Sequence, residues 1–171
     1  MSTAILIAVC LGSPALFAVT VWLSRAGAKR STAALAGGVV AAAFDIGWDA
    51  LARLEGWWTY SAANDLLDTL ALALTAAFVF GAAAGLIGWR MMRAMGWTGV
   101  ATFFAGFVGL GVLRDQLLAV NTDLMAFGQG AMPQLMGALG YLAFALAVQM
   151  TMLVIAGLPT RDPLWTNETE R

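Results

Sequence analysis

The chain has 171 residues, of which 61% are hydrophobic and 11% are charged, and its formal net charge is -1. An ordinary soluble domain carries roughly 25% charged residues, so this composition excludes a water-soluble fold. The sequence has no basic tract that could neutralise a nucleic-acid backbone, which excludes nucleic-acid binding. It has no histidine and a single cysteine, Cys10, so a metal cage built from cysteines, a zinc cluster and a histidine-ligated haem are excluded. We therefore expect no metal and no cofactor.

Five apolar runs follow one another along the chain, at about residues 3–24, 31–58, 64–89, 97–119 and 133–158. A helix needs about 20 apolar residues to cross the hydrocarbon layer of a bilayer. The last run opens at Pro133, at a helix position where a missing N–H costs little. The sequence predicts an all-α fold, a polytopic membrane bundle of about five transmembrane helices over residues 1–158, with a short polar tail at 159–171. The lipid bilayer is then its main partner.

Basic residues lie in alternate connections. The first connection carries Arg25, Lys29 and Arg30, and the third carries Arg90 and Arg93. Short basic loops are retained in the cytoplasm. We therefore expect the N-terminus outside, the C-terminal tail in the cytoplasm, and the chain as a multi-pass protein of the cell inner (cytoplasmic) membrane.

Glycines recur within the spans at spacings that place them on common helix faces. Small residues let helix backbones approach closely in lipid, where packing replaces the hydrophobic drive. We expect these faces to pack helices within the chain, or to support a homo- or hetero-oligomer. The residues are Gly37 and Gly38, Gly81 and Gly85, Gly106, Gly109 and Gly111, and Gly137 and Gly140.

Ionisable residues inside the spans are the informative ones, because a charge at mid-bilayer costs a few kcal/mol even on lenient scales. Asp45, Asp49 and Arg53 recur at i, i+4 and i+8 in the second run, with Trp48 beside them. That spacing predicts one helical face. Asp45 is the deepest of the three, at roughly 20 Å from the basic turn by a rise of about 1.5 Å per residue.

Charges in two other spans are expected at the same level of the bilayer. Asp65 and Asp68 open the third run, and Arg114 and Asp115 come late in the fourth. Because successive spans run in opposite directions, these charges should converge with those of the second run. The sequence predicts a site in the outer half of the membrane.

A purely structural interpretation of the same charges also stands. Asp49 and Arg53 fit an intrahelical ion pair, and Asp65 fits a helix cap. Arg114 and Asp115 fit the headgroup layer. Gln149 in the fifth run fits an interhelical hydrogen-bond partner.

The hypothesis of a chemical function rests on Asp45 and Asp49. Two carboxylates one helical turn apart in a low-dielectric setting do not both ionise easily, so we expect one of them to hold a proton at neutral pH. A buried neutral carboxylic acid suits a general acid. It suits a proton-coupled carrier equally well.

The stretch FDIGWDALARLEGWWTY, residues 44–60, resembles a signature of the small membrane-embedded lycopene cyclase and carotenoid biosynthesis families. Its Trp-acid pair is also similar to the Trp-Glu element of small membrane-bound terpene cyclases. The resemblance implies a helical membrane enzyme that protonates a lipophilic polyprenyl-type molecule without a metal. It further implies Asp49 as the proton donor and Asp45 as its partner.

The same resemblance implies that Trp48, Trp58 and Tyr60 flank a carbocation through cation–π contacts. The Pro-Glu-Glu element of a lycopene cyclase is missing, and only Asp65 and Asp68 lie nearby. The candidate catalytic residues are Asp45, Asp49 and Asp68. The candidate substrate-binding residues are Trp48, Arg53, Trp58, Tyr60, Arg114 and Asp115.

Three functions remain open from the sequence. The first is an isoprenoid-acting enzyme, a cyclase or related lyase, with intramembrane carboxylates as acid and base. The second is a small transporter or channel component coupled to a proton or cation. The third is an accessory subunit of a larger membrane complex. A carrier needs a polar path to the cytoplasmic side, where the sequence offers only Gln149, and this shortage favours the enzyme.

Overall fold

The computed structural model describes residues 3–60, 73–122 and 125–159, with side chains from residue 11 onward. Its helices are α1 (Thr3–Ser24), α2 (Ala28–Leu54), α4 (Ala84–Met95), α5 (Trp97–Asn121) and α6 (Met132–Ala156). A π-helical segment, η1 (Ala76–Ala83), runs directly into α4. Two short strands, β1 (Trp58–Tyr60) and β2 (Met125–Phe127), complete the described elements.

The predicted all-α membrane bundle is confirmed. Within the described residues, four helices are long and apolar enough to cross a membrane: Ala28–Leu54, Ala73–Met95, Trp97–Asn121 and Met132–Ala156. The helix Thr3–Ser24 is the fifth. Large apolar side chains such as Leu110, Val120 and Val154 are 69%, 79% and 81% exposed, as lipid-facing residues should be. The chain is a membrane protein.

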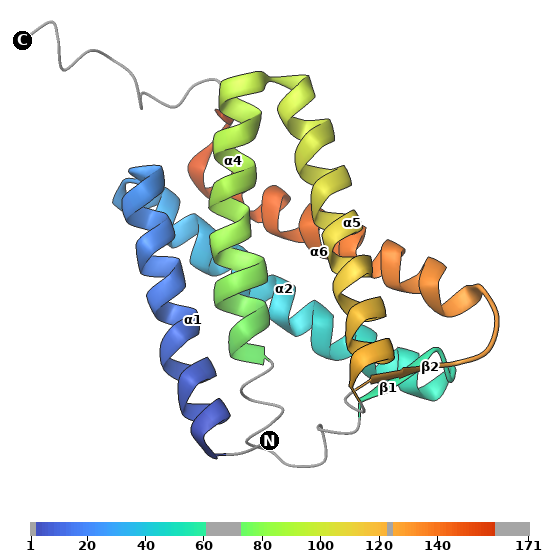
Figure 1. Ribbon diagram of the computed structural model, residues 1–171. Coiled ribbons are helices and arrows are strands. Elements are labelled where there is room, and N and C mark those ends of the chain that lie inside the picture. The colour runs from blue at the N-terminus through green and yellow to red at the C-terminus, as the bar shows by residue number, and fades with distance from the viewer. Residues whose placement is uncertain (1–2, 61–72, 123–124, 160–171) are drawn as a thin grey trace, which may run out of the picture.

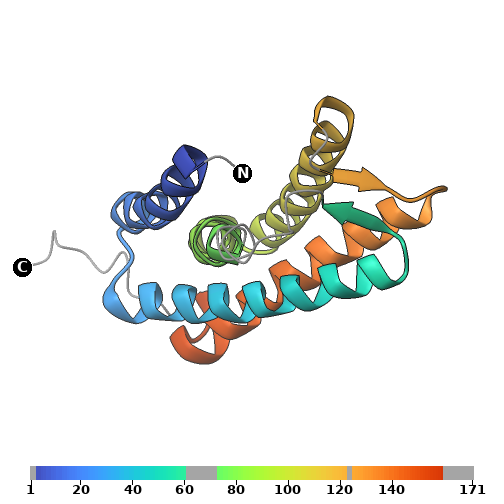
Figure 2. The ribbon, with the colours of Figure 1, turned by 90° about the horizontal axis from the view of Figure 1, so that it is seen from below.

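The helices form two layers. α2 and α6 lie side by side and cross behind the layer that contains α1, α4 and α5 (Figures 1 and 2). Lys29 and Arg30 lie in the first turn of α2, and Arg90 and Arg93 lie near the end of α4. These two basic connections, the α1–α2 and α4–α5 turns with their adjoining helix ends, lie at the upper end in Figure 1, and the two strands lie at the opposite end. Arg90 Nη1 donates to the carbonyl oxygen of Leu23 at 2.8 Å, which ties the two basic connections together.

Glycines lie at close contacts between helices, as the sequence predicts. A Cβ atom on Gly38 would meet the carbonyl oxygen of Ala77, and one on Gly81 would lie 2.5 Å from the Cα of Gly38. On the other side of α2, a Cβ atom on Gly37 would lie 3.1 Å from the carbonyl oxygen of Val148. These glycines join α2 to η1 and to α6, so their faces are used within the chain.

The third span departs from a regular α-helix. Ala76–Ala83 is π-helical, with hydrogen bonds one residue wider than in an α-helix. Such wide turns are rare and are frequently found at functional sites. Here Ala76 and Phe80 of η1 both line the cavity described below.

The two strands are the feature that the sequence analysis did not anticipate. α2 ends at Leu54, before the predicted limit near residue 58, and Gly56 follows with φ at +71°, a left-handed value that suits glycine at a helix end. The chain then pairs Trp58 with Phe127 and Tyr60 with Met125 in antiparallel register. This small sheet joins the end of α2 to the segment after α5.

Candidate functional site

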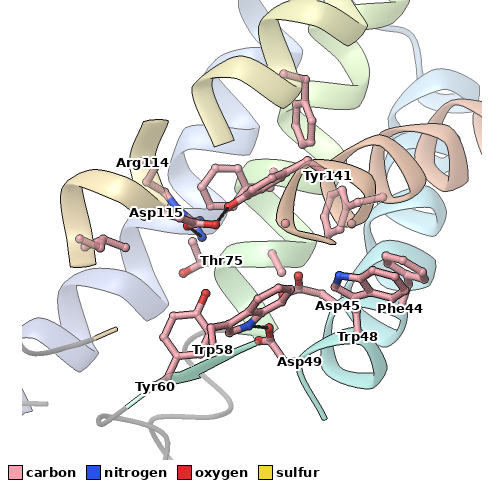
Figure 3. Close-up of a pocket in the computed structure, with 17 residues that line it drawn as sticks. Phe44, Asp45, Trp48, Asp49, Trp58, Tyr60, Thr75, Arg114, Asp115 and Tyr141 are labelled. Carbon is pink, nitrogen blue, oxygen red and sulfur yellow. Dashed lines mark hydrogen bonds and ion pairs between the residues drawn. The ribbon is translucent and has the colours of Figure 1, made fainter. Parts of the chain in front are cut away.

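A cavity of about 310 Å³ lies next to this sheet, between α2, η1, α5 and α6. Figure 3 shows the side chains that line it. Eight of the 17 are aromatic: Phe44, Trp48, Trp58, Tyr60, Phe80, Phe107, Tyr141 and Phe144. The rings support one another, with Phe44 stacked on Trp48 at 5.6 Å and Phe107 stacked on Phe144 at 5.9 Å between centroids. Aromatic rings therefore form about half of the lining.

α2 contributes the acidic wall. Asp45 and Asp49 both line the cavity, because residues four apart lie on one face of a helix. The indole Nε1 of Trp58 donates to Asp49 Oδ1 at 2.9 Å. Among the described residues, no donor hydrogen-bonds the carboxyl group of Asp45. The two carboxyl groups therefore share one cavity but differ in their surroundings.

α5 and α6 contribute a second polar group, Arg114, Asp115 and Tyr141. Arg114 donates to Asp115 Oδ1 through Nε at 3.0 Å and through Nη2 at 2.7 Å. The hydroxyl of Tyr141 donates to Asp115 Oδ2 at 2.8 Å. Asp115 is only 7% exposed, and both of its oxygens are occupied. It is therefore suited to hold its two neighbours rather than to react.

Aromatic faces complete the surroundings of Arg114. Its Cζ lies 4.9 Å from the centroid of Phe80 and 5.7 Å from that of Tyr141. A guanidinium over ring faces gains cation–π attraction, which is larger where water is excluded. A cation in the membrane is thus compensated by one carboxylate and two rings.

Tyr60 lies on β1, outside the spanning helices, and lines the same cavity. Burial raises the pKa of its phenol above the ordinary value, and the neighbouring carboxylates Asp49 and Asp115 act in the same direction. Its hydroxyl group is therefore protonated throughout the physiological range and available as a donor.

Most of the predicted site residues meet in this cavity, and Arg53 does not. Asp45, Trp48, Asp49, Trp58, Tyr60, Arg114 and Asp115 all line it. Arg53 is exposed and does not line the cavity, and within the described part of the chain its Nε donates to the backbone carbonyl of Asp49, at 3.5 Å. Each i+4 step turns about 40° around a helix of 3.6 residues per turn, so two steps rotate Arg53 away from Asp45. The expected common face of all three residues is corrected accordingly.

Two further expectations have separate outcomes. Asp65 and Asp68 lie outside the described residues. Gln149 is confirmed as an interhelical hydrogen-bond partner, because its Nε2 donates to the carbonyl oxygen of Gly85 at 3.1 Å.

Sequence reasoning missed Tyr141, Thr75 and the phenylalanines of the cavity. Tyr141 had a usable signal, since it lies in the middle of a span, away from the interface where tyrosine is enriched. No sequence signal marks the phenylalanines, because a phenylalanine in a membrane helix can equally well face lipid or line a cavity.

The described residues contain no group of three or more acidic or thiol side chains that could hold a metal ion. What the cavity offers is carboxyl groups, phenols, an indole N–H and a guanidinium. This donor set suits proton transfer and hydrogen bonding to a lipophilic molecule.

The fold and the cavity define a class: a helical membrane protein with an aromatic-walled cavity that holds two carboxyl groups on one helix. Comparison with family models, with curated proteins and with solved structures finds no match to this chain. The resemblance of residues 44–60 to membrane cyclases therefore stays a prediction.

Proposed function

We propose that the protein is an integral-membrane isoprenoid-acting enzyme, a cyclase or related lyase, in which Asp45 and Asp49 act as general acid and base. The observation that carries this proposal is that both carboxyl groups share an aromatic-walled cavity with different hydrogen-bonding surroundings. Its volume of about 310 Å³ lies at the low end of ligand pockets, roughly 300–1,000 Å³. It suits the reacting end of a polyprenyl chain whose remainder lies in the bilayer.

The hydrogen bonds favour Asp45 as the acid and Asp49 as the base. The N–H of Trp58 stabilises a charged carboxylate at Asp49. Asp45 receives no such bond from the described residues, and a carboxylate buried without donors is costly. These roles reverse those implied by the resemblance, in which Asp49 donates the proton.

The proposed reaction balances without an oxidant or a co-reactant. The O–H bond of Asp45 breaks as a C–H bond forms at one carbon of a substrate double bond, and the other carbon becomes a cation. A second double bond attacks it and forms the new C–C bond. Asp49 then takes a proton from the carbon beside the new cation, which leaves a double bond. Asp49 then releases its proton to water and Asp45 takes one from water, which restores the starting state.

The aromatic walls serve the cationic stage of this reaction. Ring faces attract a positive charge, and the attraction grows where water is excluded. Trp48 and Trp58 lie beside the two carboxyl groups, and Phe107 with Phe144 lines the wall formed by α5 and α6. A cavity of this kind also protects a carbocation from premature capture by water.

The basic connections support a location and an orientation for this activity. We propose that the chain lies in the cytoplasmic membrane with both basic connections inside, which puts the cavity in the outer half. Gly106 and Gly109 of α5 face open space and are not used in packing among the described residues. An oligomer through that face stays a prediction.

The test compares lipid extracts of cells that make long polyprenyl chains, with and without the protein, by mass spectrometry. A new isomer should appear with the wild type, and in D₂O it should carry one deuterium at the new C–H bond. Asp45→Asn should lower its yield by about 100-fold or more, the scale of general acid catalysis. Glu55→Gln, an exposed acid beyond the end of α2, is the matched control and should leave the yield unchanged. An undiminished yield from a folded Asp45→Asn protein would contradict the proposal.

A carrier would need a polar path from this cavity to the basic end of the bundle. The core toward the basic end of the bundle includes the apolar Ala34, Leu86, Val148 and Met152, and the buried amide of Gln149 lies beside them. Proton-dependent uptake of a cationic dye into proteoliposomes, abolished by Asp45→Asn, would support the carrier and contradict the enzyme if no lipid product appears.

A further inference from the structure

The guanidinium of Arg114 has more donors than its protein partners use. An arginine carries five N–H groups. Asp115 Oδ1 accepts from Nε and Nη2, and Nη1 donates to no described residue. The side chain is 38% exposed and lines the cavity. Donors therefore remain available where a ligand would lie.

These donors lie at one end of the cavity and the two carboxyl groups of α2 lie at the other. Figure 3 shows Arg114 and Asp115 on one side of the group, with Asp45 and Trp48 on the other. The hydroxyl of Tyr60, on β1, points toward the Arg114 end in the same view. The cavity thus has a hydrogen-bond-donating end and an acidic end, with aromatic rings between them.

The chemistry of the occupant follows from this polarity. A hydrocarbon at the Arg114 end would leave charged N–H groups without acceptors, which is unfavourable. An anion would meet the carboxylates of Asp115 and α2, which outnumber the single guanidinium. A neutral acceptor oxygen satisfies the donors and adds no charge.

We propose that the Arg114 end is a binding subsite for a neutral oxygen function of the lipophilic substrate, a carbonyl, ether or hydroxyl oxygen that accepts hydrogen bonds from Arg114. The inference rests on the proposed function, because it takes the cavity as the substrate site. Asp115 is a positioning residue in this arrangement, since it holds Arg114 and Tyr141 on its two oxygens. The substrate is thereby an oxygen-bearing isoprenoid rather than a pure hydrocarbon.

The test uses three ligands with one carbon skeleton: farnesene, farnesol and farnesoic acid. Their binding to the Asp45→Asn protein in nanodiscs is followed by tryptophan fluorescence, with empty nanodiscs correcting for partition into lipid. We expect farnesol to bind at least about 10-fold more tightly than farnesene, or about 1.4 kcal/mol. Farnesoic acid should bind more weakly than farnesol.

Variants assign the preference to Arg114. In Arg114→Gln the difference between farnesol and farnesene should fall to about twofold or less, since a neutral amide donates much weaker hydrogen bonds than a charged guanidinium. Arg53→Gln, which changes the same residue type outside the cavity, should keep the full difference. If Arg114→Gln does not fold, Arg114→Lys replaces it, because a lysine keeps the charge but loses the planar fork of donors.

Three results would overturn the inference: equal binding of farnesol and farnesene, a preference that survives in the Arg114 variant, or tightest binding of the acid. The proposed function fails separately. If the wild type incorporates deuterium but farnesol binds no more tightly than farnesene, only the proposed subsite is contradicted. If farnesol binds more tightly but no product forms, the proposed enzyme is contradicted and the subsite is supported.

Discussion

Trp58 reaches Asp49 from a strand rather than from the helix that carries the acid. Its indole is 5% exposed, and its N–H is the one donor to that carboxyl group among the described side chains. A neighbouring ring, Trp57, packs between Trp58 and Trp48. The state of one carboxyl group in α2 therefore depends on a residue held by the sheet.

Tyr60 gives a prediction at this scale. Because burial raises the pKa of its phenol, Tyr60 should remain protonated at pH values where an ordinary tyrosine, with a pKa near 10.0, is half ionised. The measurement is absorbance of tyrosinate during alkaline titration in detergent. The chain has two tyrosines, so the wild-type curve minus that of Tyr60→Phe isolates this group. A midpoint at or below 10 would contradict the buried position of Tyr60.

The sequence predicted the charged residues of the site better than the uncharged ones. Asp45, Asp49, Arg114 and Asp115 stand out because charges in a membrane are costly and need partners. Tyr141 does not stand out as a charge, yet its hydroxyl occupies one oxygen of Asp115. Uncharged residues gain their role from tertiary contacts, which spacing along the chain does not contain.

Among the helices, the crossing of α2 and η1 depends on two glycines facing each other. A Cβ atom on Gly38 would meet backbone of η1, which has no side chain to move aside. The backbone of η1 can make room for a methyl group at Gly38 only if the whole segment shifts, so adding that methyl group is costly.

Gly38→Ala should therefore destabilise the protein by about 1–3 kcal/mol or prevent folding. Thermal unfolding in detergent, followed by size-exclusion chromatography, measures the effect. Gly106→Ala is the matched control, since a Cβ there meets nothing within 4 Å, and alanine is a better helix former than glycine. Equal unfolding temperatures for the two variants would show that the contact of Gly38 with η1 is looser than described.

Helices were easier to predict than the connections between them. Apolar runs long enough to span a bilayer identify helices because no other open structure satisfies its backbone in lipid. The pairing of β1 with β2 joins segments far apart in the chain, and no local signal in either three-residue strand marks it. The π-helical segment likewise has no pattern that separates it from an α-helix.

For the molecule as a whole, the two ends of the bundle have opposite character. Both basic connections lie at one end and the sheet lies at the other (Figure 1), and the cavity with its carboxyl groups lies next to the sheet. The orientation of the protein therefore determines from which side of the membrane the cavity is reached.

Cysteine labelling tests that orientation. In a Cys10→Ala background, Thr59→Cys on β1 should react with a membrane-impermeant maleimide in intact cells. Lys29→Cys, in the first basic connection, should react only after permeabilisation. Both positions are exposed, so accessibility depends on the side of the membrane. The reverse pattern would show that the bundle is inverted and that its cavity opens toward the cytoplasm.

The sheet also sets the order in which the site is assembled during synthesis. β1 follows α2 and must wait for β2, which the ribosome makes only after α5. Until then Trp58 and Tyr60 have no strand to pair with, and contacts between distant segments form late because chain closure costs entropy. A chain halted before Phe127 would carry the acidic face of α2 without the sheet that completes its cavity. The cavity therefore takes its described form only after β2 and α6 have been made.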